Sequence, residues 1–260
     1  MCYNLQMKEN QFLKAALAAV KKAKPLFLKY FGNATGVSVK EGIGPSLVSD
    51  ADKEIEKLLI AELHAKFPEH AIVGEESPAQ AGIGGYCWYI DPIDGTTNFT
   101  RGISHCVISV ALFDEQGPLV AVLSAPQNNT LYQAVRGGGA FKNGKKISVS
   151  SSDSFNMLVG GMGWKVTEKG SDLFKKLLGV VRTLRVLGSD AMQLALVAEG
   201  TIDCFATTYT SLYDVGAGML LVSEAGGKVT GWKGEPFTKN QQPIVASNGK
   251  IHDSLLRVLQ

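Results

Sequence analysis

The chain has 260 residues, of which 45% are hydrophobic and 19% charged, and its 26 Lys and Arg against 24 Asp and Glu give a formal net charge of +2. A chain of this length buries roughly three quarters of its unfolded surface, which suffices for a globular core without disulfides or structural metals. The near balance of charge disfavours a nucleic-acid binder, and no apolar run is long enough to cross a bilayer. The N-terminus lacks a signal-peptide pattern, and the cysteines have no paired spacing, so we expect a reducing, cytoplasmic location.

Helical spacing of apolar residues dominates the first part of the chain. It predicts a helix over residues 5–31, which Pro25 should kink or restart. Ser49 or Asp50 can cap a second helix, with apolar side chains on one face and charged side chains on the other. This second helix is expected to end near Phe67–Pro68.

Short β-rich segments bounded by turn residues follow in the middle of the chain. Residues 106–113, 119–124 and 130–135 are predicted to form consecutive antiparallel strands. Gly137–Gly139 and Asn143–Gly144 are typical of turns.

Strands and helices alternate in the last third, which favours a second layered unit that meets the first near residues 145–155. The predicted helices are 172–178, 191–198, 213–224 and a short one that closes the chain, and the predicted strands are 183–187, 202–206, 228–230 and 244–247.

The segment from Trp88 to Phe99 reads WYIDPIDGTTNF and carries the clearest chemical signal. An apolar strand leads into Asp91 and Asp94, and the proline between them restricts the turn, so both carboxylates can point to one place. Gly95 allows a ligand to approach the backbone. Thr96 and the next threonine suit the start of a helical turn, whose N–H groups favour an anion. Hard oxygen ligands beside an anion-binding turn suggest a Mg²⁺–phosphate site. The alternative is a surface Asp-Gly turn capped by threonine.

Acidic residues at two other positions are also candidates for the site, and each also has a simpler structural explanation. Glu75 and Glu76 follow an apolar strand at 71–74, although adjacent glutamates at a strand end are commonly just solvated. Asp214 begins an apolar helix, where an acid is also favoured by the helix dipole alone.

Taken together, these pieces resemble the inositol monophosphatase family, within the lithium-sensitive, Mg²⁺-dependent phosphatase superfamily. The string IDPIDGTTNF at 90–99 is the most specific match. Weaker matches occur in the family's order over nearly the whole chain: 47–52, 74–77, 137–143, 188 onward, 213–218 and 224–227.

The resemblance implies an α+β or α/β fold, a layered αβαβα sandwich of the inositol monophosphatase and fructose-1,6-bisphosphatase type. An antiparallel sheet with helices would precede a mixed sheet with helices, with the site between them. We expect one compact catalytic unit over 1–260, with subdomains of about 1–147 and 148–260. Many relatives are homodimers, so a homodimer is a possible state.

Carried over residue by residue, the resemblance implies a set of metal ligands: Glu75, Asp91, the Ile93 carbonyl, Asp94 and Asp214. They would hold two or three Mg²⁺ ions, with Asp91 bridging two of them. Two such ions roughly 3.5–4 Å apart can activate a water and stabilise the leaving oxygen of a phosphate ester. Lys40 resembles a loop residue near this site, in a loop one residue longer than usual.

Catalytic and phosphate-binding roles follow from the same resemblance. Glu75 and Thr96 would orient and help deprotonate the attacking water, and Asp52 would support an outer water of the metal. The amides of Gly95 and Thr96 would hold phosphate oxygens, with Thr97 beside them.

The part expected to bind the substrate alcohol departs from the family's pattern. Thr207 stands where the family commonly has a glutamate that contacts inositol hydroxyls, and Tyr213 replaces a usual tryptophan. Asp190 stands where a small residue is usual; it could supply the missing hydroxyl contact, or simply be an acid in the first turn of a helix. Trp164 and Lys165, after a predicted strand, could line the pocket, although a packed tryptophan is the simpler reading. The remaining substrate-binding candidates are Gly188, Ser189 and Asp214.

The sequence therefore predicts a Mg²⁺-dependent hydrolase of a small phosphate monoester, such as an inositol-1-phosphate-like polyol phosphate. Alternatives within the class are fructose-1,6-bisphosphatase and 3′(2′),5′-bisphosphate nucleotidase. A catalytically silent phosphate-metabolite sensor on the same fold and a non-catalytic cation-binding protein are alternatives outside it; the full set of acids and Thr96 argues against a silent relative. The expected partner is a small phosphate ester rather than nucleic acid or a membrane. Lithium inhibition is expected from the resemblance alone.

Overall fold

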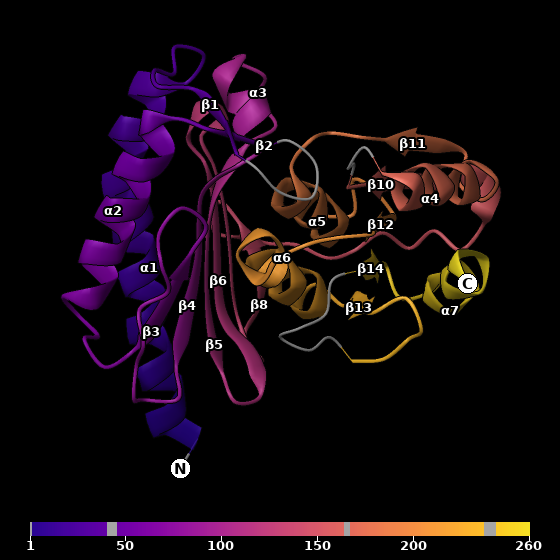
Figure 1. Ribbon diagram of the computed structural model, residues 1–260. Helices are drawn as coiled ribbons and strands as arrows, with labels where there is room; N and C mark the ends of the chain where they lie inside the picture. Colours follow the sequence, from indigo (N-terminus) through magenta and orange to yellow (C-terminus); the bar gives the residue numbers. More distant parts are fainter. Residues whose placement is uncertain (1, 41–45, 164–166, 237–242) are drawn as a thin grey trace.

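The computed structural model describes residues 2–40, 46–163, 167–236 and 243–260. Its elements form five layers, helix–sheet–helix–sheet–helix (Figure 1), which confirms the predicted αβαβα arrangement. Each helical layer is a pair of helices. One outer layer holds α1 (Cys2–Tyr30) and α2 (Asp50–His64), and the central layer holds α5 (Asp190–Ala198) and α6 (Leu212–Glu224). The other outer layer holds α4 (Glu168–Leu178) and α7 (His252–Leu259).

The larger sheet has the order β3-β4-β5-β6-β7-β8-β9. β3 pairs with β4 in parallel and every later pair is antiparallel, so the three consecutive antiparallel strands predicted from the sequence are confirmed. Their bounds are β3 (Ala71–Gly74), β4 (Cys87–Asp94), β5 (Val107–Asp114), β6 (Gly117–Ala125), β7 (Thr130–Val135), β8 (Gly139–Lys142) and β9 (Lys145–Lys146).

The smaller sheet has the order β11-β10-β12-β14-β13 and mixes parallel with antiparallel pairs. The mixed character predicted for this part is therefore confirmed, and the last two strands have the predicted bounds. The strands are β10 (Val159–Met162), β11 (Thr183–Arg185), β12 (Cys204–Thr207), β13 (Lys228–Thr230) and β14 (Ile244–Ser247).

The first two helices differ from expectation at specific points. Of the two outcomes predicted at Pro25, a kink or a restart, the restart does not occur, because α1 continues through the proline. Packing of its buried face, which includes Phe12 and Phe27 on either side of the proline, keeps the helix in one piece. α2 begins after Ser49 as predicted but ends at His64, before the expected Phe67.

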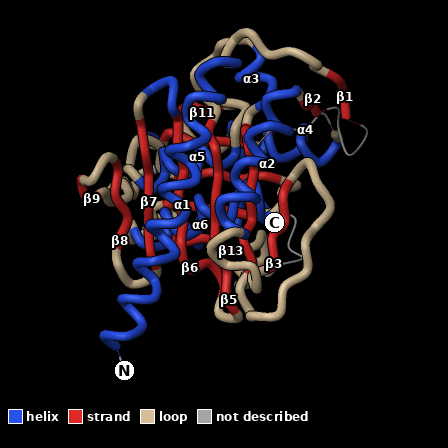
Figure 2. The backbone as a smooth tube through the Cα atoms, turned by 90° about the vertical axis from the view of Figure 1, so that its left-hand side faces the viewer, coloured by secondary structure: helices blue, strands red, loops and turns tan. Residues whose placement is uncertain are grey.

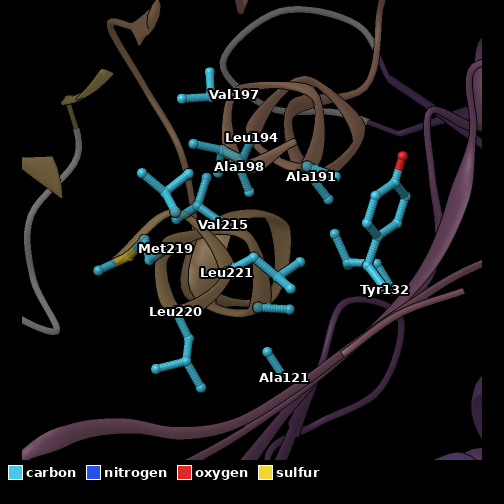
Figure 3. Packing of buried hydrophobic residues seen from close by; sticks show 14 of the residues in the cluster. Ala121, Tyr132, Ala191, Leu194, Val197, Ala198, Val215, Met219, Leu220 and Leu221 are labelled. Atoms are coloured by element: carbon cyan, nitrogen blue, oxygen red, sulfur yellow. The ribbon is translucent and has the colours of Figure 1, made fainter. Parts of the chain in front are cut away.

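The two central helices are apolar on nearly all sides because both sheets bury them. The core between the larger sheet and these helices is shown in Figure 3. Leu194 of α5 packs so closely on α6 that a Cβ at Gly218 would lie 2.5 Å from it. The position of α6 relative to α5 is thus fixed by close contact. Residues labelled in this core include Ala121, Tyr132, Ala191, Leu194, Val197, Ala198, Val215, Met219, Leu220 and Leu221.

The short elements gather near the carboxyl end of β4. The hairpin of β1 (Ser38–Lys40) and β2 (Ser46–Val48) and the short helix α3 (Thr96–Thr100) lie together at the top of Figures 1 and 2. Their few residues alternate little in hydrophobicity, and the hairpin was not predicted. In the part of the chain that the structure describes, no helix combines the length and hydropathy needed to cross a membrane.

Candidate metal centre

The acidic pair Asp91 and Asp94 lies within the end of β4, not in a turn after it. β4 advances from Asp91 to Asp94 while β5 recedes only from Ser109 to Val107, so β4 carries one extra residue there. Residues three apart on a regular strand face opposite sides of the sheet, and one extra residue brings them back to the same side. The Ile93 N–H stabilises this bulge by donating to Asp91 Oδ1 at 2.8 Å.

Packing shows which side the two carboxylates face. Tyr89, two residues before the first acid, packs in the core beside α5 and α6, whereas Ile93 packs in the core beside α1 and α2. Asp94 reaches the start of α5, where the Ser189 hydroxyl and the Ala191 N–H donate to its Oδ2. The acids therefore point into the central helical layer.

A third acid enters from α6. Asp214 is in the first turn of this helix, and the Ser211 N–H donates to its Oδ2 at 2.9 Å in a capping box. One oxygen from each of Asp91, Asp94 and Asp214 lies within 4.8 Å of the others. Acids distant in the sequence thus meet where β4 faces the amino ends of the central helices.

Glu75 approaches the cluster from the end of β3. The parallel pairing of β3 with β4 sets Glu75 level with Asp91, and the Glu75 N–H donates to the Ile90 carbonyl at 3.2 Å. Lys40 of β1 reaches the same point, with its Nζ 2.7 Å from Glu75 Oε1 and 2.5 Å from Glu76 Oε1. Burial lowers the pKa of Lys40, but these two carboxylates outweigh it and hold its pKa above the usual value.

Thr96 follows the acidic pair in the chain, one residue after Gly95. Gly95 has a φ of +91°, and a Cβ there would lie 2.9 Å from a backbone carbonyl oxygen, so the turn requires glycine. The Thr96 hydroxyl is 3.1 Å from the Ile93 carbonyl oxygen and 3.3 Å from Asp52 Oδ1. Asp52 is fully buried, and its second oxygen caps α2. The Asp52–Thr96 contact links α2 to the acidic cluster.

The electrostatics of the cluster favour a bound cation. Burial raises the pKa of Asp91 well above its usual value, and the neighbouring Glu75 and Asp94 raise it further. Burial also raises the pKa of Asp94 to about 6, although hydrogen bonds from the start of α5 oppose this. A like-charged pair about 5 Å apart costs roughly 3 kcal/mol at an effective dielectric near 20. A divalent cation would offset that repulsion, and carboxylate and carbonyl oxygens are ligands that suit Mg²⁺. The residues present therefore fit a magnesium site.

Comparison with known proteins agrees with this arrangement. The sequence model that describes the inositol monophosphatase family matches residues 8–260. The chain belongs to the inositol monophosphatase family.

Similar proteins cover the chain almost completely. It is 33% identical over 247 residues to the fructose-1,6-bisphosphatase/inositol-1-monophosphatase of Thermotoga maritima, covering 95% of each chain. It is 34% identical over 258 residues to the Nus factor SuhB of Pseudomonas aeruginosa, again covering 95% of each. The crystal structure of the extragenic suppressor protein suhB from Bartonella henselae matches with a TM-score of 0.90 at 30% identity, covering 96% of this chain and 98% of that one.

In this member of the inositol monophosphatase family, several residues predicted to bind the substrate lie beside the acidic cluster. Ser189 donates to Asp94 and caps α5, and Asp190 is the first residue of that helix. A Cβ built on Gly163 would lie 2.7 Å from Asp190 Oδ1 and 2.6 Å from Thr207 Oγ1. Asp190 is therefore next to the position where the family commonly carries a glutamate.

Other candidates are placed differently. Thr97 is exposed, and in the described part of the chain no polar contact joins it to the acids. Gly188 packs against Asn98, since a Cβ there would lie 3.0 Å from the Asn98 side-chain nitrogen. Trp164 and Lys165 lie outside the described residues.

Two polar residues of the site were missed by the sequence analysis. Asn98 donates to the carbonyl oxygens of His105 and Leu187, which fastens α3 to the segment before α5. Glu56, expected on the charged face of α2, is only 2% exposed and accepts two hydrogen bonds from the segment after β3. Its spacing of one helical turn from Asp52 was the available signal, whereas nothing in the sequence singles out Asn98.

Proposed function

We propose that this protein is a Mg²⁺-dependent phosphomonoesterase that acts on a small polyol phosphate of the inositol-1-phosphate kind. The observation that carries the proposal is the convergence of Asp91, Asp94 and Asp214, whose oxygens lie within 4.8 Å of one another. Glu75 and Thr96 border this cluster, and both lie near Asp52. The alternative, an isolated surface turn, does not account for the approach of Glu75 from the end of β3 and of Asp214 from α6.

The acidic residues would divide into two overlapping ligand sets. Asp91, Asp94 and Asp214 form one, and Glu75 with Asp91 and the Ile93 carbonyl forms the other, so Asp91 would be shared. Bound Mg²⁺ ions would neutralise phosphate charge, lower the pKa of the attacking water and stabilise the leaving oxygen.

The protein's own groups would orient the water and hold its proton. The Thr96 hydroxyl can donate to Asp52 and still accept a hydrogen bond from a water through a lone pair. Glu75 lies near the same place and would accept the proton of that water. Lys40, paired with Glu75 in the structure, would have to share or release that carboxylate as cations bind.

Phosphate and alcohol would bind on adjacent surfaces. The N–H groups of Gly95, Thr96 and Thr97 would donate hydrogen bonds to phosphate oxygens at the start of α3. Ser189 and Gly188 border the same turn, and Asp190 with Asp214 would accept hydrogen bonds from substrate hydroxyls. With Thr207 in place of the family's glutamate, we expect Asp190 to take the larger share of alcohol recognition.

Relatives of nearly equal identity carry different names, so identity does not choose between hydrolysis and a role like that of a Nus factor. The intact acidic cluster, with Thr96 held to Asp52, favours hydrolysis. A protein without catalytic activity would not require both the acidic cluster and the Thr96 hydroxyl.

A phosphate-release screen tests the proposal. The substrates should include inositol monophosphates, glycerol phosphates, fructose 1,6-bisphosphate and adenosine 3′,5′-bisphosphate, each with and without Mg²⁺. We expect Mg²⁺-dependent release that is fastest with a polyol monophosphate and is inhibited by Li⁺. Preference for either bisphosphate would select one of the alternative substrates, and no release from any ester would contradict the enzymatic function.

A further inference from the structure

Glu56 is a buried acid on α2 that holds the segment carrying Glu75. Its side chain is only 2% exposed, and its two carboxylate oxygens accept different donors. The Glu76 N–H donates to Oε2 at 2.9 Å, and the Ser77 hydroxyl donates to Oε1. Both donors come directly after Glu75, so the carboxylate fixes the backbone on which Glu75 stands.

The contact extends to the residue before Glu75. A Cβ built on Gly74 would lie 2.5 Å from the carboxylate carbon and from Oε2 of Glu56. Any side chain at this position would push Glu56 away. The carboxylate thus contacts the chain on both sides of Glu75.

The same segment also borders an open space next to α2. A hollow of about 600 Å³ lies beside it, bounded by α2 and by Glu76, Ser77 and Gln80. Besides its hydrogen bonds to Glu56, this segment is held by the Glu75 N–H, which donates to the Ile90 carbonyl, and by Lys40, which pairs with Glu75 and Glu76.

We propose that Glu56 is a positioning residue that sets the place of Glu75 and thereby the affinity of the cation that Glu75 holds together with Asp91. This inference rests on the proposed function. Glu56 touches neither the three-aspartate cluster nor Asp94's partners on α5, so its effect should be confined to one of the two ligand sets. Loss of such a supporting contact typically weakens metal binding about 10- to 100-fold.

The test measures Mn²⁺ binding, with free Mn²⁺ counted by electron paramagnetic resonance, in the full-length wild type and four variants. Glu56→Gln keeps the size of the side chain but has only one acceptor oxygen for two donors. Ser77→Ala removes one donor. Glu54→Gln is the matched control, because Glu54 is an exposed acid on the same helix that contacts Tyr30. Asp214→Asn alters the other ligand set.

We expect the wild type to bind at least two Mn²⁺ ions. Glu56→Gln should weaken one of them about tenfold and leave the other unchanged, and Ser77→Ala should weaken the same ion by a smaller factor. Asp214→Asn should weaken the other ion, and Glu54→Gln should weaken neither. Thermal melting without metal should stay within a few degrees of the wild type for Glu56→Gln and Ser77→Ala.

Unchanged binding in both Glu56→Gln and Ser77→Ala would overturn this inference while leaving the proposed function standing. Equal weakening of both ions in Glu56→Gln would also overturn it, since that pattern indicates a general structural role. A wild type that binds no Mn²⁺ would overturn the proposed function itself, and this inference with it.

Discussion

Asp91 and Asp94 lie on the same face of β4 because one extra residue interrupts the pairing of β4 with β5 between them. Without that bulge, the alternation of the strand would bury one carboxylate against α1 and α2, away from Asp214. The bulge is therefore what brings two acids three residues apart into the cluster that Asp214 completes. Pro92 fits this place because it has no N–H to contribute to the interrupted ladder.

Replacing Asp91 with Asn should abolish turnover and leave the fold intact. Asp91 is shared by both proposed ligand sets, so its loss removes several kcal/mol of stabilisation of the transition state, on the order of a 10³-fold loss of rate. Burial and neighbouring acids raise the pKa of Asp91, so its charged form destabilises the metal-free fold above its usual pKa. The metal-free melting temperature of the variant should therefore equal or exceed that of the wild type.

Phosphate release and melting with and without Mg²⁺ check this prediction. Asp253→Asn is a suitable control, because Asp253 is an exposed acid paired with Lys228 far from the cluster. Near-normal hydrolysis by Asp91→Asn would refute the assignment of Asp91 as a shared ligand.

Thr96→Ala should lower turnover by about 10²-fold, with little change in the apparent affinity for substrate, because the proposed role is to orient and activate water. Thr96→Ser keeps the hydroxyl that contacts Asp52 and should recover most of the activity. Steady-state kcat and KM for the two variants separate these effects. A similar loss in both variants, or a rise in KM that accounts for the whole defect, would argue for a packing role.

Regular elements were predictable because burial of one or both faces leaves a recognisable pattern of apolar residues in the sequence. The strands 130–135, 228–230 and 244–247 were predicted with their observed bounds, since turn residues and alternating or continuous apolar runs define them. Helix ends were less certain. α2 ends at His64, although the N–H groups of Lys66 and Phe67 still donate to the Leu63 carbonyl, next to the predicted end at Pro68.

The site could be predicted only in part from local sequence. Proximity of Asp91 to Asp94 was predicted from their spacing and the proline between them, whereas the approach of Asp214 depends on how α6 packs between two sheets. The bulge itself was missed, because the segment was expected to be a turn. The sequence does not single out Glu56, because charged residues on an amphipathic helix are usually solvated. Its burial depends on donors twenty residues away, which no helical period reveals.

Gly95→Ala should destabilise the fold and displace the start of α3. The φ of +91° costs a residue with a Cβ roughly 1–3 kcal/mol, and crowding adds to this because the Cβ would lie 2.9 Å from the His105 oxygen and 3.0 Å from the Gly188 oxygen. Gly226→Ala is a matched control, since Gly226 has a φ of +90° and no atom within 4 Å of its Cβ position. Denaturant unfolding should show the larger loss at position 95. Equal losses would mean that the close approach to Gly188 has no energetic consequence.

His252 should contribute a loss of stability as the pH drops from about 6.5 toward 4. His252 is fully buried, with its Nε2 2.9 Å from the Thr230 hydroxyl and its Nδ1 2.9 Å from the Ser247 hydroxyl. The Thr230 hydroxyl donates to a backbone carbonyl, which assigns the proton of the neutral ring to Nε2. Burial lowers the pKa of His252 from 6.5 to about 4, and the charge of Lys228 acts in the same direction.

The sign of the effect follows from proton binding. Between pH 6.5 and 4 the unfolded chain binds a proton at His252 and the folded chain does not, so acid favours unfolding over that interval. A shift of this size corresponds to roughly 3 kcal/mol at most. Denaturant unfolding of wild type and His252→Asn across pH 4–8 isolates the contribution, because the carboxylates are common to both proteins. The difference in unfolding free energy between the two should shrink by about 2–3 kcal/mol toward pH 4. A difference that stays constant with pH would show that His252 keeps an ordinary pKa in the folded protein.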